Sequence, residues 1–273
     1  MFMRLAALAT SVAFATPVLA QQSDTDELFE LLKLPEIIEV MREEGLSYGE
    51  SIGGDLFAGE PSADWQANVE RIYNYDRMIG MVRDDFEASL EDVDVGPMID
   101  FFGSQRGQMI VELEVSARRA LLDDAVEEAS EEAAAIALAE EDPRMMQVQT
   151  FVEVNNLIET NVAGALNSNL AFYYGLLDGS AFGGVLTEDQ ILEDVWAQEE
   201  DIRANTTEWI YSFLFLAYQP LEDDDLDAYI ALSETEAGRD LNRAMFESFD
   251  RLFEGISRSL GRAAANEMTS QEL

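Results

Sequence analysis

Residues 236–261 read EAGRDLNRAMFESFDRLFEGISRSLG, and this stretch decides the fold of the chain. Its large apolar side chains recur every three or four residues, which is the period of one face of an α-helix. Other helices must cover such a stripe, and we expect the glycine at its end, Gly261, to end the helix. The stripe consists of Leu241, Met245, Phe249, Leu252, Phe253, Ile256 and Leu260.

The remainder of the chain is also typical of helices. Alternating β-branched residues are nearly absent, whereas Ala, Glu, Leu and Met are abundant. The sequence therefore predicts an all-α protein. The first helix is expected to run to Leu32, the second to stop near Gly45, and those from Ser62 and Thr187 to be long. Helix starts are expected at Ser23, Pro35, Ser62, Asp142–Pro143 and the capping box Thr187–Gln190.

The N-terminus has the pattern of a signal peptide, residues 1–20. Arg4 gives a positive n-region, the apolar stretch Leu5–Phe14 follows, and Val18 and Ala20 are the small residues of a cleavage site. The chain has no cysteine, so neither lipid attachment nor a disulfide is expected. We predict cleavage after Ala20 and a periplasmic location, or secretion beyond it. Trp209–Ala217 is too short to span a bilayer, so no integral membrane segment is expected in the mature chain.

The charge of the chain is strongly negative. The formal net charge is −40, and Lys33 is the only lysine. Such a surface repels nucleic acid phosphates and anionic membranes, which makes both poor candidates for partners. Two interpretations stay open. The surface is adapted to salty surroundings, where ions screen its self-repulsion, or it binds cations or cationic peptides.

The most acidic segment, residues 123–142, reads DDAVEEASEEAAAIALAEED. Its helix propensity is high, although carboxylates four residues apart repel each other. Ile136 and Leu138 are its bulky residues and the expected contributors to a core. We interpret the segment as a solvated helical connector, with an acidic docking arm as the alternative.

Shifting the chain by 131 positions reveals an internal repeat. The pairing of Trp65 with Trp196 weighs most, because the chain has only three tryptophans. The repeat predicts two related helical units, residues 21–142 and 143–273, joined near Asp142–Pro143. Other aligned pairs are Gly53 with Gly184, Ile79 with Ile210, Leu90 with Leu221, Ile99 with Ile230 and Gly107 with Gly238.

A short motif marks the corner of the first unit, where residues 101–108 read FFGSQRGQ. Ser104 is placed to cap the following helix, because the free N–H groups of a helix start need an acceptor. Gly107 falls in the first turn, where the missing side chain lets another helix approach closely. Phe101 and Phe102 precede the corner, and Phe102 is expected to pack beneath it. The motif is therefore interpreted as mainly structural.

This corner resembles the aromatic-x-Ser-x-x-Gly signature of a family of exported bacterial proteins, the domain of unknown function numbered 2059. The resemblance covers about 40 residues per unit and implies a helical fold and a periplasmic address. The family has no accepted activity to carry over. The second unit departs from the signature, since Thr235 replaces the serine and Ser233 the aromatic residue, while Gly238 is kept.

Three glycines, Gly45, Gly49 and Gly53, recur every fourth residue. On a helix they share one face, so they predict close packing against a second helix.

The residue types exclude several kinds of chemistry. The chain has no histidine and no cysteine, which removes catalytic triads, cysteine nucleophiles and ordinary zinc or copper sites. Asp223, Asp225, Asp227 and Glu234 have the spacing of a calcium loop, but Ala228 stands where that loop needs glycine. We interpret these acidic residues as the start of a helix, whose dipole they favour.

These observations predict no catalytic, cofactor-binding or metal-ligating residue. The leading hypothesis is an exported, non-enzymatic interaction or binding protein that serves envelope assembly or holds an apolar ligand between its units. One alternative is a peptidoglycan-active enzyme that depends on carboxylates, the groups with which glycosidases act. The other is an acidic binder of cations or cationic peptides.

Overall fold

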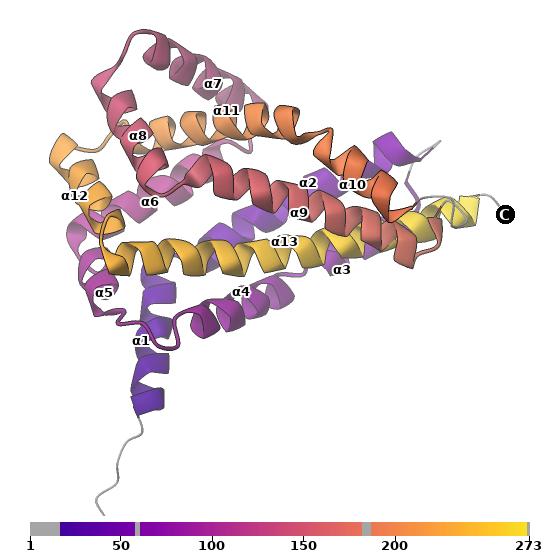
Figure 1. Cartoon of the computed structure of the whole chain (residues 1–273), viewed down its shortest axis with the longest axis horizontal. Coiled ribbons are helices and arrows are strands. Elements are labelled where there is room, and N and C mark those ends of the chain that lie inside the picture. The colour runs from indigo at the N-terminus through magenta and orange to yellow at the C-terminus, as the bar shows by residue number, and fades with distance from the viewer. Residues whose placement is uncertain (1–16, 58–60, 182–186, 272–273) are drawn as a thin grey trace, which may run out of the picture.

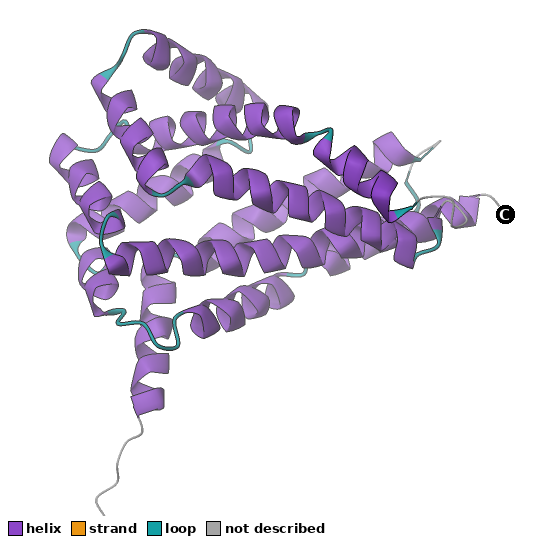
Figure 2. Cartoon of the chain, in the orientation of Figure 1, coloured by secondary structure: helices purple, strands orange, loops and turns teal. Residues whose placement is uncertain are grey.

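The computed structural model describes residues 17–57, 61–181 and 187–271. Within these ranges the chain forms helices joined by short loops and contains no strand, which confirms the all-α prediction (Figure 1, Figure 2). Residues 1–16, most of the predicted signal peptide, lie outside the described ranges. The helices are α1 (Pro17–Leu31), α2 (Leu34–Leu56), α3 (Ala63–Ile72), α4 (Tyr75–Ser89), α5 (Gly96–Phe102), α6 (Gln105–Ala120), α7 (Asp124–Ala139), α8 (Pro143–Val154), α9 (Leu157–Asp178), α10 (Glu188–Trp196), α11 (Glu199–Tyr218), α12 (Asp223–Ser233) and α13 (Glu236–Gln271).

The 36-residue helix α13 runs the length of the molecule, with α9 beside it (Figure 1). Leu252 and Leu260 of its apolar stripe are almost fully buried, with 1% exposure each. The prediction that Gly261 ends this helix is wrong, because α13 continues to Gln271. Gly261 instead allows α13 to lie close to α9, because a Cβ there would lie 2.1 Å from the backbone oxygen of Phe172 in α9.

Helix α9 matches this close approach with small residues of its own. A Cβ on Gly175 would lie 2.2 Å from the backbone oxygen of Arg258, and a Cβ on Gly179 would lie 2.4 Å from the Cβ of Ala265. Glycines on both helices therefore let the two backbones come together, and dispersion contacts along the seam stabilise the pair.

Gly45, Gly49 and Gly53 form one face of α2, which packs against α3 and the residues next to α3, as predicted. A Cβ on Gly45 would collide with the Tyr73 ring, and a Cβ on Gly49 with Val69. The indole Nε1–H of Trp65 donates to the Gly49 backbone oxygen at 3.0 Å. The prediction that Gly45 stops this helix is wrong, because the glycines form its packing face and α2 continues to Leu56.

Several helix starts are confirmed. The Ser62 hydroxyl accepts from the backbone N–H of Trp65, Asp142 caps α8 with Pro143 in the first turn, and Thr187 and Gln190 form a capping box. Pro35 stands in the first turn of α2. These starts were predictable because capping is a local interaction.

Three further helix boundaries differ from the prediction. Ser23 lies inside α1, which begins at Pro17. The helix that starts at Ser62 ends at Ile72, because Asn74 caps a new helix by accepting from the backbone N–H of Arg77. The helix that starts at Thr187 ends at Trp196, and α11 begins at Glu199.

The acidic segment forms α7, which is largely solvated and packs along α11. The expectation for its bulky residues is wrong: Ile136 is 51% exposed and Leu138 is 37% exposed. The buried residues are small, namely Ser130, Ala134 and Ala137. Small side chains allow the helix to approach α11 closely while its carboxylates stay in water.

The predicted repeat is matched in one part only. Trp65 lies buried near the start of α3, whereas Trp196 lies at the end of α10 with 65% exposure. The tryptophan pair therefore gives the repeat no structural support, and Gly184 lies outside the described residues. The order of a short helix, a corner and a longer helix is kept, as α5–α6 and as α12–α13.

The two predicted units pack together, and each of the two hydrophobic clusters among the described residues contains side chains of both. Side chains of α1 to α6 pack in the same cluster as residues of α9 and α13, which lie on the other side of the boundary at Asp142–Pro143. That boundary is the start of α8, and the helices on either side of it are interleaved (Figure 1). Within the described ranges, no helix combines the length and apolar content needed to cross a membrane.

Candidate functional site: an aromatic cavity

The motif corner and its counterpart have the same local geometry. The Ser104 hydroxyl accepts from the Gly107 backbone N–H at 3.1 Å and donates to the Phe101 carbonyl at 2.6 Å. Thr235 does the same with Gly238 and Leu232, at 3.0 and 2.6 Å. The capping prediction is confirmed for Ser104, and Thr235 caps α13 in the same way.

Each corner also needs its glycine. A Cβ on Gly107 would lie 2.2 Å from the carbonyl oxygen of Phe101, and a Cβ on Gly238 would lie 2.1 Å from that of Leu232. The close approach is that of the preceding short helix, α5 or α12. The glycines are therefore steric requirements of the two corners.

The aromatic residues of the motif reach a cluster that joins distant parts of the chain. The Phe101 ring stacks on Tyr229 of α12 at 5.7 Å, and Phe102 meets the same ring edge-on at 5.8 Å. Tyr229 also lies 4.8 Å from Phe151, which meets Tyr218 at 5.6 Å. Aromatic contacts of this kind fix the relative positions of α5, α8, α11 and α12.

Beside this cluster lies a cavity of about 620 Å³. Parts of α2, α6, α8, α9, α11, α12 and α13 form its wall together with Leu32, which precedes α2, so both predicted units contribute. Its volume falls in the range of small-molecule pockets, about 300–1,000 Å³. Large apolar side chains dominate the lining, among them Met41, Phe151, Trp209, Phe213, Phe249 and Phe253.

One carboxyl group, that of Glu114 on α6, faces this apolar space. Its Oε1 accepts a hydrogen bond from the Tyr218 hydroxyl at 2.5 Å, and no hydrogen bond from a described residue reaches Oε2. Burial raises the pKa of Glu114 to about 7, although the Tyr218 bond lowers it. Burial also raises the pKa values of Tyr218 and Tyr229 well above 10, with the nearby Glu114 charge adding to both.

The cationic side chain in the wall, Arg118, is already paired. Its Nε and Nη2 donate to both carboxylate oxygens of Glu44 at 3.0 and 2.8 Å. Its guanidinium also lies 5.5 Å from the Trp209 ring, and Trp209 stacks on Phe213 at 5.1 Å. Arg118 therefore braces α2 and α11 against α6.

A second carboxyl, that of Asp250 on α13, lines another part of the cavity. Its pKa is raised, first by burial and then by the neighbouring charge of Glu254. The lining amides are satisfied within the wall: Asn242 donates to the Asn155 carbonyl at 3.0 Å, and Asn155 donates to the Phe151 carbonyl at 2.9 Å.

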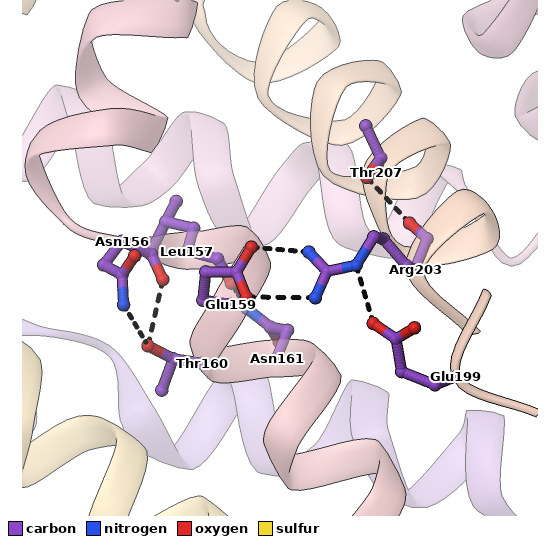
Figure 3. A network of polar contacts seen from close by, with 8 residues as sticks. All are labelled: Asn156, Leu157, Glu159, Thr160, Asn161, Glu199, Arg203 and Thr207. Atoms are coloured by element: carbon purple, nitrogen blue, oxygen red, sulfur yellow. Dashed lines mark hydrogen bonds and ion pairs between the residues drawn. The ribbon is translucent and has the colours of Figure 1, made fainter. Parts of the chain in front are cut away.

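A polar network holds the α9 and α11 walls together (Figure 3). Arg203 on α11 donates to both carboxylate oxygens of Glu159 on α9 and to Glu199 one turn earlier on its own helix. These bonds raise the pKa of Arg203 and lower that of Glu159. In the same turn of α9, the Asn161 amide donates to the carbonyl of Leu157 at 2.7 Å, and both residues line the cavity.

The structure gathers some of the predicted motif residues and separates others. Phe101 and Phe102 join the aromatic cluster, and Gly238 lines the cavity. Trp65 belongs to the packed core, and Trp196 lies on the surface.

The residues that define the cavity were missed, above all Glu114, Tyr218 and Arg118. A signal was present for Glu114. It falls four residues after Ile110 and three before Ala117, both buried, so a carboxyl occupies the apolar stripe of α6. Tyr218 gave no comparable signal, because its partner lies 104 positions away in the sequence.

Of the four acidic residues with calcium-loop spacing, Asp223 and Asp225 lie at a helix start, as interpreted, whereas Glu234 follows the end of the same helix. Asp223 and Asp225 lie in the first turn of α12. They pair with arginines, Asp223 with Arg144 at 2.8 Å and Asp225 with Arg106 at 2.6 Å. Among the described residues no group of three or more acidic side chains is arranged to hold a metal ion.

No protein-family model, curated protein or solved structure matches this chain. The resemblance to the family of unknown function numbered 2059 therefore stays a prediction. The geometry of the cavity is what supports a function.

Proposed function

We propose that this chain is an exported binding protein that holds an apolar ligand in the cavity between α9, α11 and α13. The observation that carries the proposal is a space of about 620 Å³ lined mainly by aromatic and aliphatic side chains. A preformed concave site of this size, mostly apolar with a few polar groups, is the usual form of a small-molecule pocket.

Ion pairs tie two sides of the cavity wall. The Arg118–Glu44 pair links α6 to α2, and the Arg203–Glu159 pair links α11 to α9. A preformed, braced pocket keeps the ordering cost of binding low. The periplasmic address stays part of the proposal and rests on the signal-peptide pattern of residues 1–20.

Titration with the neutral dye Nile red, whose emission rises in apolar surroundings, tests the proposal on the mature chain. Ala165 on α9 lines the cavity, while Ala163 on the same helix is exposed and does not. Ala165→Phe should fill the space and weaken dye binding at least tenfold, whereas Ala163→Phe should leave binding within twofold. The result that contradicts the proposal is equal dye binding by both variants, or no saturable binding by the unmodified chain.

A further inference from the structure

The wall of the cavity carries a negative charge, although most of its lining is apolar. Of its charged wall residues, Glu114 and Asp250 are acids and Arg118 is a base. Arg118 is neutralised by its two hydrogen bonds to Glu44. The charge that the wall offers to an occupant is therefore negative, as is the surface from which a ligand arrives, since the formal net charge is −40.

The geometry around Glu114 resembles half of an ion pair. Tyr218 occupies Oε1, and Oε2 receives no hydrogen bond from a described residue. Glu114 sits between packed helices, yet it keeps accessible surface because it borders the cavity. A buried carboxylate without a counter-charge is costly, and a cation beside it removes that cost.

Aromatic residues line the same part of the wall. Tyr218 donates to Glu114, Tyr229 lies close enough for the Glu114 charge to raise its pKa, and Phe151 contacts both rings. These rings lower the polarity around the carboxyl, which strengthens its attraction for a cation. An anionic head group would meet the opposite: two carboxyls in the wall, and an arginine already committed to Glu44.

We propose that the occupant is an amphipathic amine, a hydrophobic chain or ring system bearing an ammonium group that pairs with Glu114 Oε2 among the rings of Phe151, Tyr218 and Tyr229. This inference rests on the proposed function, since it names the chemical class of the apolar ligand. It also explains why a carboxyl group lies on the apolar stripe of α6 and faces the cavity.

The carboxyl must be ionised to pair with an ammonium group, and its raised pKa sets the range of pH in which pairing develops. The groups that face Glu114 are Arg118 on its own helix, Tyr218 on α11 and Tyr229 on α12, with Glu44 of α2 behind Arg118. The α8 wall contributes the uncharged Phe151 and Asn155, and Asp250 of α13 lines another part of the cavity. The tyrosines have pKa values above the physiological range, so Glu114 is the group that titrates near neutrality.

Displacement of Nile red by three ligands with one chain, dodecylamine, dodecanol and dodecanoate, tests the inference at physiological salt and below micelle formation. We expect the amine to bind at least tenfold more tightly than the alcohol, and dodecanoate to bind weakest. Glu114→Gln keeps the shape of the side chain and an acceptor for Tyr218. It should lower amine affinity tenfold or more and leave dodecanol within about threefold. The matched control is Glu112→Gln, which removes the same charge from an exposed position of α6 and should leave the amine preference unchanged.

A second measurement needs no variant. Because a group with a pKa of about 7 goes from mostly protonated to mostly ionised between pH 6 and pH 8, amine affinity should rise about tenfold across that range, while dodecanol affinity stays level. Dodecanol binding with no amine preference, or an amine preference that survives Glu114→Gln, overturns the inference and leaves the proposed function standing. Failure of all three ligands and of Nile red overturns both.

Discussion

The apolar stripe of α13 meets two environments along its length. Towards the C-terminal end, Leu252, Ile256 and Leu260 lie in a closely packed core, where each is at most 6% exposed. Nearer the N-terminal end, Met245, Phe249 and Phe253 border the cavity, and all three are partly exposed. An apolar stripe on a helix therefore shows that a face is covered, but not whether side chains of the same chain cover it.

The largest change in stability is expected from a substitution in the packed core. Trp65 is 1% exposed, meets Phe57 edge-on and donates to Gly49. Trp65→Ala leaves a cavity and an unpaired carbonyl, and should lower the free energy of unfolding by about 3–5 kcal/mol. Chemical denaturation checks this. Trp196→Ala, at 65% exposure, is the control and should change stability by less than about 0.5 kcal/mol.

In the wall of the cavity, the expected change in the free energy of unfolding has the opposite sign, because removing a buried charge there should stabilise the fold. The pKa of Glu114 is raised from 4.5 to about 7, so the folded state binds its proton more tightly than the unfolded state. Stability is therefore lost as the pH rises from about 4.5 to 7, and the full cost, about 3 kcal/mol, applies above pH 7.

Glu114→Gln should therefore raise the free energy of unfolding at pH 8 by up to about 3 kcal/mol, and by about 1 kcal/mol at pH 5. Denaturation of both proteins at the two pH values checks this. A destabilised variant at pH 8 would show that the carboxyl supports the fold. A stabilised variant that no longer prefers amines would show that it serves binding at the expense of stability.

Two glycines of α13 compare a close helix contact with a position that has room for a side chain. Gly261 lies at the contact with α9, and Gly255 lies where a Cβ fits. Gly261→Ala places a Cβ 2.1 Å from the Phe172 carbonyl, which should separate α13 from α9 and lower stability by about 1–3 kcal/mol.

Gly255→Ala is the matched substitution and should have the smallest effect. Its Cβ would meet Met81 Cε at 3.4 Å, an ordinary contact, so alanine should raise stability by about 0.5–1 kcal/mol through its helix propensity. Thermal unfolding of both variants checks the pair, and equal shifts would contradict the seam between α9 and α13.

Local signals in the sequence were sufficient for the helix starts. Ser62, Ser104, Asp142 and Thr187 each cap a helix through an atom within three residues, so spacing alone predicts them. Helix ends were less predictable. A glycine at the end of an apolar stripe is typical of a helix end, but the role of Gly261 is set by its contact with Phe172 of α9, a residue 89 positions away.

The candidate site was less predictable still. Its aromatic cluster joins Phe101, Phe151, Tyr218 and Tyr229, which only the packing of four helices brings together. The carboxyl of Glu114 on an apolar stripe was readable in the sequence, whereas the cavity that it faces was not.

The central claim, that the cavity is a ligand site, is tested most directly by contact quenching of Trp209. In a variant with Trp65→Phe and Trp196→Phe, Trp209 is the only tryptophan, and it lines the cavity. Bromododecanol carries a heavy atom that quenches tryptophan emission on contact. We expect saturable quenching near one equivalent, lost when Ala165→Phe is added and kept when Ala163→Phe is added. Quenching that does not saturate, or that persists with Ala165→Phe, would contradict the account.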